Sequence, residues 1–310
     1  MLGAPAVALA VDLYAYADAS CTRDGKLRVE ANIPLRLLGS VDGRISTLDS
    51  KRLLEPLRLA ARDTLDYVGN RSYGASVSVS CEMPVGAGLG SSAATTVAII
   101  AAVSRASGKR LEKKEIFKIA FGPESYLHGK PSGVDQATCT YGGIVLFSKP
   151  DKVKRLALKT MPRLVVCDTG IHRSTKGLVG SVVKRSRFQS ALFHRYVKEV
   201  SQISRSAVRA LKKEDDEELG ALMNRSQELL EQIGVSHPML NQFVKMARRN
   251  GALGAKLTGA GGGGCMIALC EDERGMGRAI RAFRRQGGTP YRISLDRSGV
   301  QSKVNGTGLK

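Results

Sequence analysis

The most informative segment of this 310-residue chain is PVGAGLGSSAA, at residues 84–94. It follows an alternating, strand-like run at 73–82 and leads into an apolar run of helical character that ends before Gly108. Three spaced glycines allow several backbone N–H groups to face one anion, and the N-terminus of the following helix adds its positive dipole end. The segment therefore predicts a loop that binds a polyphosphate.

Two better-known phosphate-binding loops are excluded by the residues around these glycines. No Lys-Ser or Lys-Thr pair follows the last glycine, as a Walker A loop requires. No βαβ unit with an acidic ribose-binding residue follows, as a dinucleotide site requires. Ser91 is equally well explained as the N-cap of the helix. Ser92 lies one residue into the helix, where capping contributes little, and it is a candidate metal ligand.

A second segment carries two acidic residues and is AFGPESYLHGKPSGVD, at residues 120–135. Glu124 lies in a mostly apolar helical run, four residues before His128, so the two can share one face. Asp135 follows a Pro-Ser-Gly turn, which we expect to hold its carboxylate on a rigid loop. In phosphoryl transfer one carboxylate can bind Mg²⁺ while another accepts the hydroxyl proton. Taken singly, each acid is more often a solvated helix or turn residue, and His128 is expected to be structural.

The third segment is KLTGAGGGGC, at residues 256–265, between two apolar strand-like runs. Glycine occupies five of the six positions from 259 to 264, which permits the close approach of another backbone or of a ligand. A flexible hairpin is the alternative, but a tight turn needs only one or two glycines. We therefore expect a rigid floor beneath phosphates or an acceptor molecule.

The composition is that of a globular protein with a sizeable core, since 43% of the residues are hydrophobic and 25% are charged. Six cysteines form no CxxC pair and there are four histidines, so no zinc pattern is present. The N-terminal segment lacks a basic region and its apolar run is interrupted by Asp12, which excludes a signal peptide and a membrane span. We expect a cytoplasmic protein with no membrane partner.

The net charge of +20 favours anionic partners. Nucleic acid is one alternative, for which a basic run from Lys184 to Lys198 is the candidate surface. Only 5% of the residues are aromatic, and no nucleic-acid-binding motif accompanies the charge. We therefore expect a solvated basic face and no nucleic-acid partner. The charge equally suits an enzyme whose substrates are nucleotides and carboxylates.

Strand-like and helix-like runs follow one another without a regular βαβ period, which indicates an α+β protein. Strands are expected at 5–20, 26–34, 73–82, 144–147, 163–170 and 291–295, and on both sides of the loop within 253–270. Helices are expected at 48–68, 91–107, 111–128, 175–212, 214–232, 237–250 and 272–286. The helix at 111–128 contains Gly122-Pro123, so it kinks there or restarts with Pro123 in its first turn. A Lys- and Pro-rich turn at 149–155 predicts domains at 1–160 and 161–310, with the last strand able to return to the first domain.

The three segments, in this order, resemble the three motifs of the GHMP kinase superfamily, which includes galactokinase, homoserine kinase, mevalonate kinase and phosphomevalonate kinase. The resemblance covers nearly the whole chain, from Gly3 to the last strand. Residues 128–135, 168–176 and 256–265 are most similar to the corresponding segments of mevalonate kinases. The resemblance implies two α+β domains, the first with a left-handed βαβ unit, which is an exception to the usual hand, and the second ferredoxin-like.

The resemblance also implies an enzyme that uses ATP and Mg²⁺ to phosphorylate the primary hydroxyl of mevalonate, giving 5-phosphomevalonate for isoprenoid biosynthesis. Asp135 would be the catalytic base, and Ser92 and Glu124 would bind Mg²⁺. The residues expected to bind ATP are Pro84, Gly86, Ala87, Gly88, Leu89, Gly90, Ser91 and Ser92. The residues expected to line the transfer site are Thr175, Gly259, Ala260, Gly261 and Gly262. The alternatives are another kinase of the superfamily, acting on phosphomevalonate or a sugar, and an inactive nucleotide-binding relative. A homodimer is compatible with the resemblance.

The N-terminus departs from the family pattern. A strand and loop of the type Pro-Gly-Lys…Gly-Glu-His normally precede the segment matched here by Gly3-Ala4-Pro5, and they supply a lysine near the transferred phosphate. We expect Met1 to be an internal methionine preceded by such a segment. An in-frame stop codon directly upstream would contradict this expectation and would favour the inactive relative.

Overall fold

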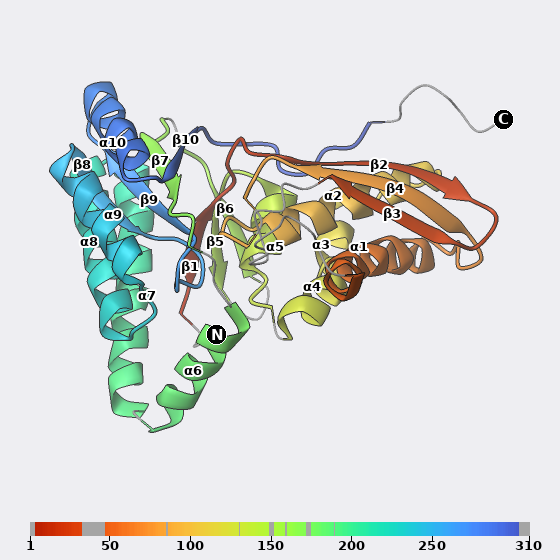
Figure 1. Ribbon diagram of the computed structural model, residues 1–310, viewed down its shortest axis with the longest axis horizontal. Helices are drawn as coiled ribbons and strands as arrows, with labels where there is room; N and C mark the ends of the chain where they lie inside the picture. Colours follow the sequence, from red (N-terminus) through yellow and green to blue (C-terminus); the bar gives the residue numbers. More distant parts are fainter. Residues whose placement is uncertain are drawn as a thin grey trace. The chain divides into compact units, whose positions relative to one another are not determined.

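The computed structural model describes residues 4–32, 47–84, 86–129, 131–148, 152–158, 160–171, 175–188 and 190–303 (Figure 1). The chain forms two compact units, each built from several segments. Unit 1 comprises Met1–Asp12, Gly86–Leu89 and Ile144–Leu295, and unit 2 comprises Leu13–Val85, Gly90–Gly143 and Asp296–Lys310. The predicted boundary near residue 160 divides the sequence differently, because β-strands from both ends of the first half pair within unit 1. The segment that begins at Asp296 belongs to unit 2, whereas the last predicted strand, at 291–295, belongs to unit 1.

Unit 2 is a three-stranded sheet covered by helices. Its strands are β2 (Ala15–Thr22), β3 (Leu27–Asn32) and β4 (Gly74–Cys81), in the order β2-β4-β3. Strand β4 is antiparallel to β2 and parallel to β3, so the connection that holds α1 (Thr47–Tyr67) is a βαβ crossover. Its hand stays a prediction. Alternate residues of β4 are buried against α1 and α2 (Ser91–Ala106), as the period of two predicts. Figure 1 shows α1 running beside these strands.

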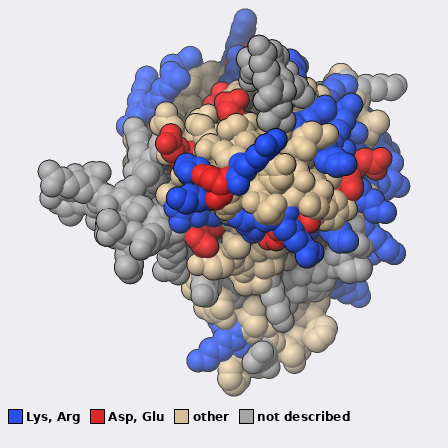
Figure 2. Space-filling view, turned by 90° about the vertical axis from the view of Figure 1, so that its right-hand side faces the viewer, with Lys and Arg blue, Asp and Glu red and all other residues tan. Residues whose placement is uncertain are grey.

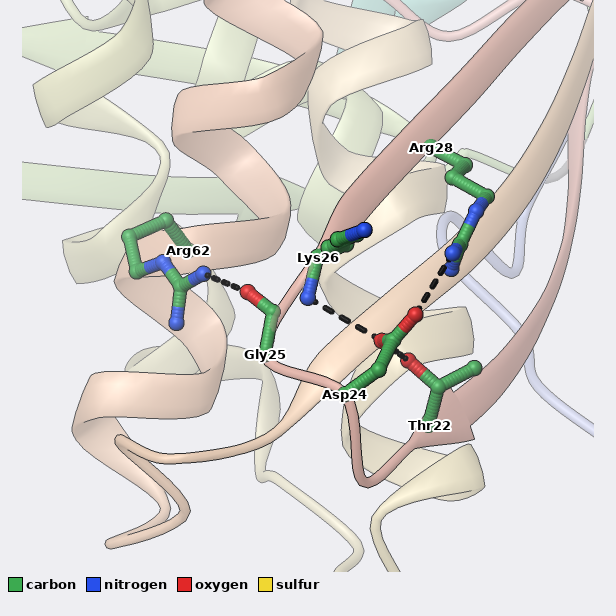
Figure 3. A network of polar contacts seen from close by, with 6 residues as sticks. All are labelled: Thr22, Asp24, Gly25, Lys26, Arg28 and Arg62. Carbon is green, nitrogen blue, oxygen red and sulfur yellow. Dashed lines mark hydrogen bonds and ion pairs between the residues drawn. The ribbon is translucent and has the colours of Figure 1, made fainter.

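The turn between β2 and β3 is held by polar contacts from three directions (Figure 3). The carboxylate of Asp24 accepts hydrogen bonds from the Thr22 hydroxyl, the Lys26 backbone N–H and the Arg28 guanidinium. These contacts, led by Arg28, hold the pKa of Asp24 well below its ordinary value. Arg62 of α1 donates to the carbonyl of Gly25 at 3.2 Å. The turn is therefore tied to the helix layer.

Unit 1 contains a sheet with the order β10-β7-β9-β8, all of whose neighbours are antiparallel. Its strands are β7 (Leu164–Asp168), β8 (Ala252–Leu257), β9 (Cys265–Cys270) and β10 (Thr289–Ile293). Numbered along the chain, this order is 4-1-3-2, which is the ferredoxin-like arrangement and confirms the prediction. A second sheet has the order β1-β5-β6, from β1 (Ala6–Leu9), β5 (Ile144–Ser148) and β6 (Lys152–Leu156).

Helices cover the ferredoxin-like sheet. Those that contact its strands are α8 (Asp216–Gln232), α9 (Pro238–Arg249) and α10 (Glu273–Arg285). Helix α7 (Ser190–Lys213) packs against α8 and β1, and α6 (Thr175–Phe188) packs against α7. Phe243 of α9 and Phe283 of α10 stack in the core with ring centroids 5.7 Å apart. Helix α8 lies along the edge strand β8, where Asn224 and Gln227 bond the backbone of residues 253, 255 and 257. These contacts close an otherwise open sheet edge just before the second glycine-rich loop.

Several elements differ from the sequence predictions. The run at 111–128 is two helices, α3 (Lys113–Ile119) and α4 (Phe121–His128), and α4 restarts with Pro123 in its first turn, as one of the two alternatives predicted. An unpredicted helix, α5 (Val134–Tyr141), follows. Part of the turn predicted at 149–155 is strand β6. The strand predicted at 5–20 is interrupted between β1 and β2, which pair in different sheets.

The basic residues are spread over the surface, and the cysteines form no disulfide bonds. Figure 2 shows Lys and Arg scattered over the viewed face, interrupted by acidic and neutral residues. All six cysteines are free thiols, and four of them are buried. No helix in the part of the chain that the structure describes is long and apolar enough to cross a membrane.

Candidate active site

The N-terminus of α2 is open to an anion. Gly90 occupies the N-cap position with φ +76°, in the left-handed region that favours glycine, and as a glycine it has no side chain with which to cap the helix. Ser91 is thus the first helical residue, and the alternative that it serves as the N-cap is not what the structure shows. The first N–H groups of a 16-residue helix therefore keep their capacity to bind a negatively charged group.

Asp135 lies beside this helix terminus. A methyl group placed on Gly90 would be 3.5 Å from Cβ and 3.7 Å from Oδ1 of Asp135. Asp135 sits in the first turn of α5, behind an N-cap glycine at Gly133, and not on the rigid loop that we predicted. The residue is exposed, so an acceptor molecule can reach the carboxylate.

Glu124 and Ser92 form a hydrogen-bonded pair, and Glu124 is far more buried than Asp135. Glu124 of α4 is 2% exposed, and the Ser92 hydroxyl of α2 donates to its Oε2 at 3.4 Å. Burial raises the pKa of Glu124 to about 7, the negative charge of Asp135 adds to the rise, and the bond from Ser92 opposes it. A buried carboxylate with a raised pKa beside a hydroxyl is a costly arrangement that is common at functional sites. Unit 2 thus brings Gly90, Ser92, Glu124 and Asp135 into one cluster.

Cys139, which the sequence did not single out, contacts this cluster. It lies one turn after Asp135 on α5, and its thiol contacts the carbonyl of Gly90 at 4.0 Å. Burial raises the pKa of this thiol well above its ordinary value, so it stays protonated. The spacing of four residues from Asp135 was the available signal, but it has meaning only if the segment is a helix.

The first part of the glycine-rich loop is held within unit 1. Gly86 and Gly88 have φ of +75° and +89°, and Ala87 between them is buried. Alternation of this kind forms a nest of backbone N–H groups that binds anions. The carbonyl of Ala87 accepts a hydrogen bond of 2.8 Å from the N–H of Cys265, at the end of the second glycine-rich loop. The two loops predicted separately from sequence therefore contact each other.

The second glycine-rich loop, residues 259–264, makes its described contacts with neighbouring backbone. Its N–H groups at Gly262 and Gly264 each donate at 2.8 Å to the carbonyls of Val235 and Ile171. The close approach of other backbones, one of the two options predicted, is present. A floor beneath the phosphates or the acceptor stays a prediction, and of its residues Gly259 is exposed and Ala260 half-buried.

Thr169 fastens the same loop from the segment after β7. Its N–H and its hydroxyl both donate to the carbonyl of Gly264, at 3.1 and 2.7 Å. The side chain is buried, with 7% exposure. The segment 168–176 was singled out only for its resemblance, and nothing in its composition indicated this contact. Thr175 begins α6, but its side chain, like Val85 and the side chain of His128, lies outside the described residues.

A resident metal site made of protein ligands alone is not present among the described residues, which contain no group of three or more His, Cys, Asp or Glu side chains able to hold an ion. Ser92 and Glu124 offer two oxygen ligands. Mg²⁺ is usually bound by one or two protein oxygens together with substrate phosphates and water. The donor set therefore fits Mg²⁺ that arrives with a nucleotide.

Comparison with known proteins identifies the family. Residues 55–143 match the model of the GHMP kinase N-terminal domain, and residues 207–289 match that of the GHMP kinase C-terminal region. The chain is 36% identical to a curated mevalonate kinase of Pyrococcus furiosus, over 96% of this chain and 92% of the relative. It is 37% identical to that of Pyrococcus horikoshii, over 96% and 91%. The crystal structure of Leishmania major mevalonate kinase in complex with R-mevalonate superposes with a TM-score of 0.80 at 29% identity, over 96% of this chain and 91% of that one. The chain therefore belongs to the GHMP kinase family, among relatives that are curated as mevalonate kinases.

Proposed function

We propose that this enzyme transfers the γ-phosphoryl group of ATP to the primary hydroxyl of mevalonate, giving 5-phosphomevalonate and ADP. One observation carries the assignment of the catalytic residue. The carboxylate of Asp135 lies against Gly90, where the phosphate loop enters α2. A base in that position is next to the group that an uncapped helix N-terminus binds.

The backbone of the phosphate loop binds and orients the triphosphate. The N–H groups of residues 86–92, with the dipole of α2, stabilise the charge of the β- and γ-phosphates. Asp135 then holds the acceptor hydroxyl in line with the γ-phosphorus and takes its proton. A bond forms between the hydroxyl oxygen and the γ-phosphorus, and the bond from that phosphorus to the β–γ bridging oxygen breaks. ADP leaves with the bridging oxygen, and the enzyme forms no covalent bond.

Ser92 and Glu124 would hold Mg²⁺, which supplies positive charge to the β- and γ-phosphates when bound. The ionised form of Glu124 is the one that binds a cation. Because its pKa is raised to about 7, Glu124 gives up a proton when the cation binds near neutral pH. The burial that makes its charge unfavourable in the free protein therefore favours a bound cation.

The acceptor is assigned from the relatives. The curated relatives at 34–37% identity over nearly the whole chain are mevalonate kinases, and the Leishmania major structure is a complex with R-mevalonate. The net charge of +20 suits two anionic substrates, a nucleotide and a carboxylate. We assign Thr175 and Gly259, Ala260, Gly261 and Gly262 to the transfer site on the same basis, and the reaction to the cytoplasm.

A panel of alcohols tests the proposal. ADP release is measured with R-mevalonate, phosphomevalonate, homoserine and galactose, each with ATP and Mg²⁺. The proposal predicts kcat/KM for mevalonate at least about 100-fold above that for every other alcohol, a discrimination of about 3 kcal/mol. A preference for phosphomevalonate or a sugar would replace the acceptor, and ATP binding without turnover on any alcohol would contradict the enzymatic function.

A further inference from the structure

The side chain of Thr169 makes a hydrogen bond just beyond the end of strand β7. Strand β7 ends at Asp168, and its backbone pairing with β9 ends at the pair Asp168–Cys265. One residue later, both donors of Thr169 converge on a single oxygen, the carbonyl of Gly264. The contact joins segments that are 95 residues apart in sequence.

The carbonyl that Thr169 binds belongs to a peptide group whose other end holds the phosphate loop. The C=O of Gly264 and the N–H of Cys265 lie in one rigid plane. The C=O accepts from the Thr169 hydroxyl at 2.7 Å, and the N–H donates to the Ala87 carbonyl at 2.8 Å. Fixing the first end therefore fixes the direction of the second, and hydrogen bonds linked through one peptide strengthen each other.

A second peptide plane continues this line into the phosphate loop. In a trans peptide the C=O of Ala87 and the N–H of Gly88 point in opposite directions. Since the Ala87 carbonyl points at Cys265, the N–H of Gly88 points away from the second glycine-rich loop. No described residue accepts a hydrogen bond from it. The backbones of Gly264 and Ala87 are closely packed, since a methyl group on Gly264 would lie 2.3 Å from the Ala87 carbonyl oxygen.

We propose that Thr169 is a positioning residue for the nucleotide, whose hydroxyl, through the Gly264–Cys265 peptide, holds Ala87 so that the N–H of Gly88 faces a phosphate. The proposal rests on the proposed function, because it needs the phosphate loop to bind ATP. It also gives the segment after β7 a task in nucleotide binding. The second glycine-rich loop then acts as a brace for the first.

The test compares Thr169→Val with Thr169→Ser. Valine keeps the shape and loses the hydroxyl, while serine keeps the hydroxyl. The Kd for Mg·ATP, measured by calorimetry without acceptor, should rise about tenfold in the valine variant, as expected for one hydrogen bond, and stay within about twofold in the serine variant. In turnover assays the change should appear in the KM for ATP more than in kcat. Ser204→Ala is a matched control, because it removes another hydroxyl-to-carbonyl bond, a half-buried one of 2.9 Å to Pro5 in the same unit.

The outcomes separate the two proposals. A valine variant that loses thermal stability like the Ser204 control but binds ATP as tightly as the wild type would show a structural role only and would overturn the inference. If the valine variant does not fold, hydrogen exchange on the wild type decides: ATP should slow exchange of the Gly88 and Cys265 amides together, and slowing at Gly88 alone would overturn the inference. A wild-type protein that binds no ATP would instead refute the proposed function.

Discussion

Replacing Glu124 with glutamine should stabilise the protein at alkaline pH while abolishing most of its activity. Glu124 is 2% exposed, and its pKa lies at about 7 instead of the ordinary 4.5. The folded state therefore binds the proton more tightly than the unfolded chain. For an acid whose pKa is raised by folding, stability is highest below about pH 4.5, falls as the pH rises towards 7, and is constant above that.

The size of the effect follows from the pKa. Because a tenfold change in proton affinity is worth about 1.4 kcal/mol, the rise from 4.5 to about 7 corresponds to about 3 kcal/mol of lost stability at pH 8. At pH 5 the loss is below about 1 kcal/mol, because this pH is only about half a unit above the ordinary pKa of 4.5 that applies to the unfolded chain. Glutamine has the same shape, carries no charge at either pH, and can still accept the hydrogen bond from Ser92. The variant should therefore be more stable than the wild type by up to about 3 kcal/mol at pH 8 and by much less at pH 5.

Urea denaturation of both proteins at pH 5 and pH 8, without nucleotide or Mg²⁺, measures this difference. Ser92→Ala is the matched control, since it leaves the Glu124 charge in place and should show no gain at pH 8. The glutamine variant should also lose most of its turnover. A variant that is less stable than the wild type at pH 8, or that gains the same stability at both pH values, would refute the reasoning.

Two further substitutions test the geometry around the same cluster. Ser92→Ala should lower kcat/KM by about tenfold, because one of the two protein oxygens that would bind Mg²⁺ is removed, and high Mg²⁺ should partly recover the loss. A titration of activity against Mg²⁺ at fixed ATP measures this. An unchanged Mg²⁺ requirement would contradict the assignment. Gly90→Ala should cost about 1–2 kcal/mol of stability from the left-handed backbone alone, and it should weaken ATP binding by narrowing the space beside Asp135. Denaturation and calorimetry report the two effects, and a variant with wild-type values for both would exclude this geometry.

Much of the fold was predictable because its long elements have strong patterns. The alternation in β4 and the apolar face of α2 were identified with bounds that agree within a few residues. The glycine-rich loops stood out because few other structures need so many glycines. The ferredoxin-like sheet followed from the resemblance, and its order 4-1-3-2 confirms it.

The misses have physical reasons. Helix α5 has eight residues, several of them β-branched, and it is stabilised by packing against α2 and α3, where Ala137 is fully buried, and not by propensity. Strand β6, KVKRL, is an exposed edge strand rich in charge, which is typical of edges but looks like a turn in sequence.

The remaining contacts of the site could not be predicted, because they join segments that lie far apart in the sequence. The glycines of the second glycine-rich loop allowed the approach of either a backbone or a ligand, and the backbone partners at Ala87, Ile171 and Val235 come from three distant segments. No local pattern identifies such partners. The same holds for Thr169, whose role depends on a contact with Gly264.

Turnover and ATP binding by Asp135→Asn provide the most direct test of the proposal that this carboxylate is the base for phosphoryl transfer. Asparagine keeps the shape and removes the proton acceptor. Single-turnover assays with mevalonate should show a rate lower by about 100- to 10,000-fold, as expected for loss of a general base, while the Kd for Mg·ATP stays within a few-fold. A variant that turns over at a rate near that of the wild type, or one that loses ATP binding to the same extent as turnover, would contradict the central claim.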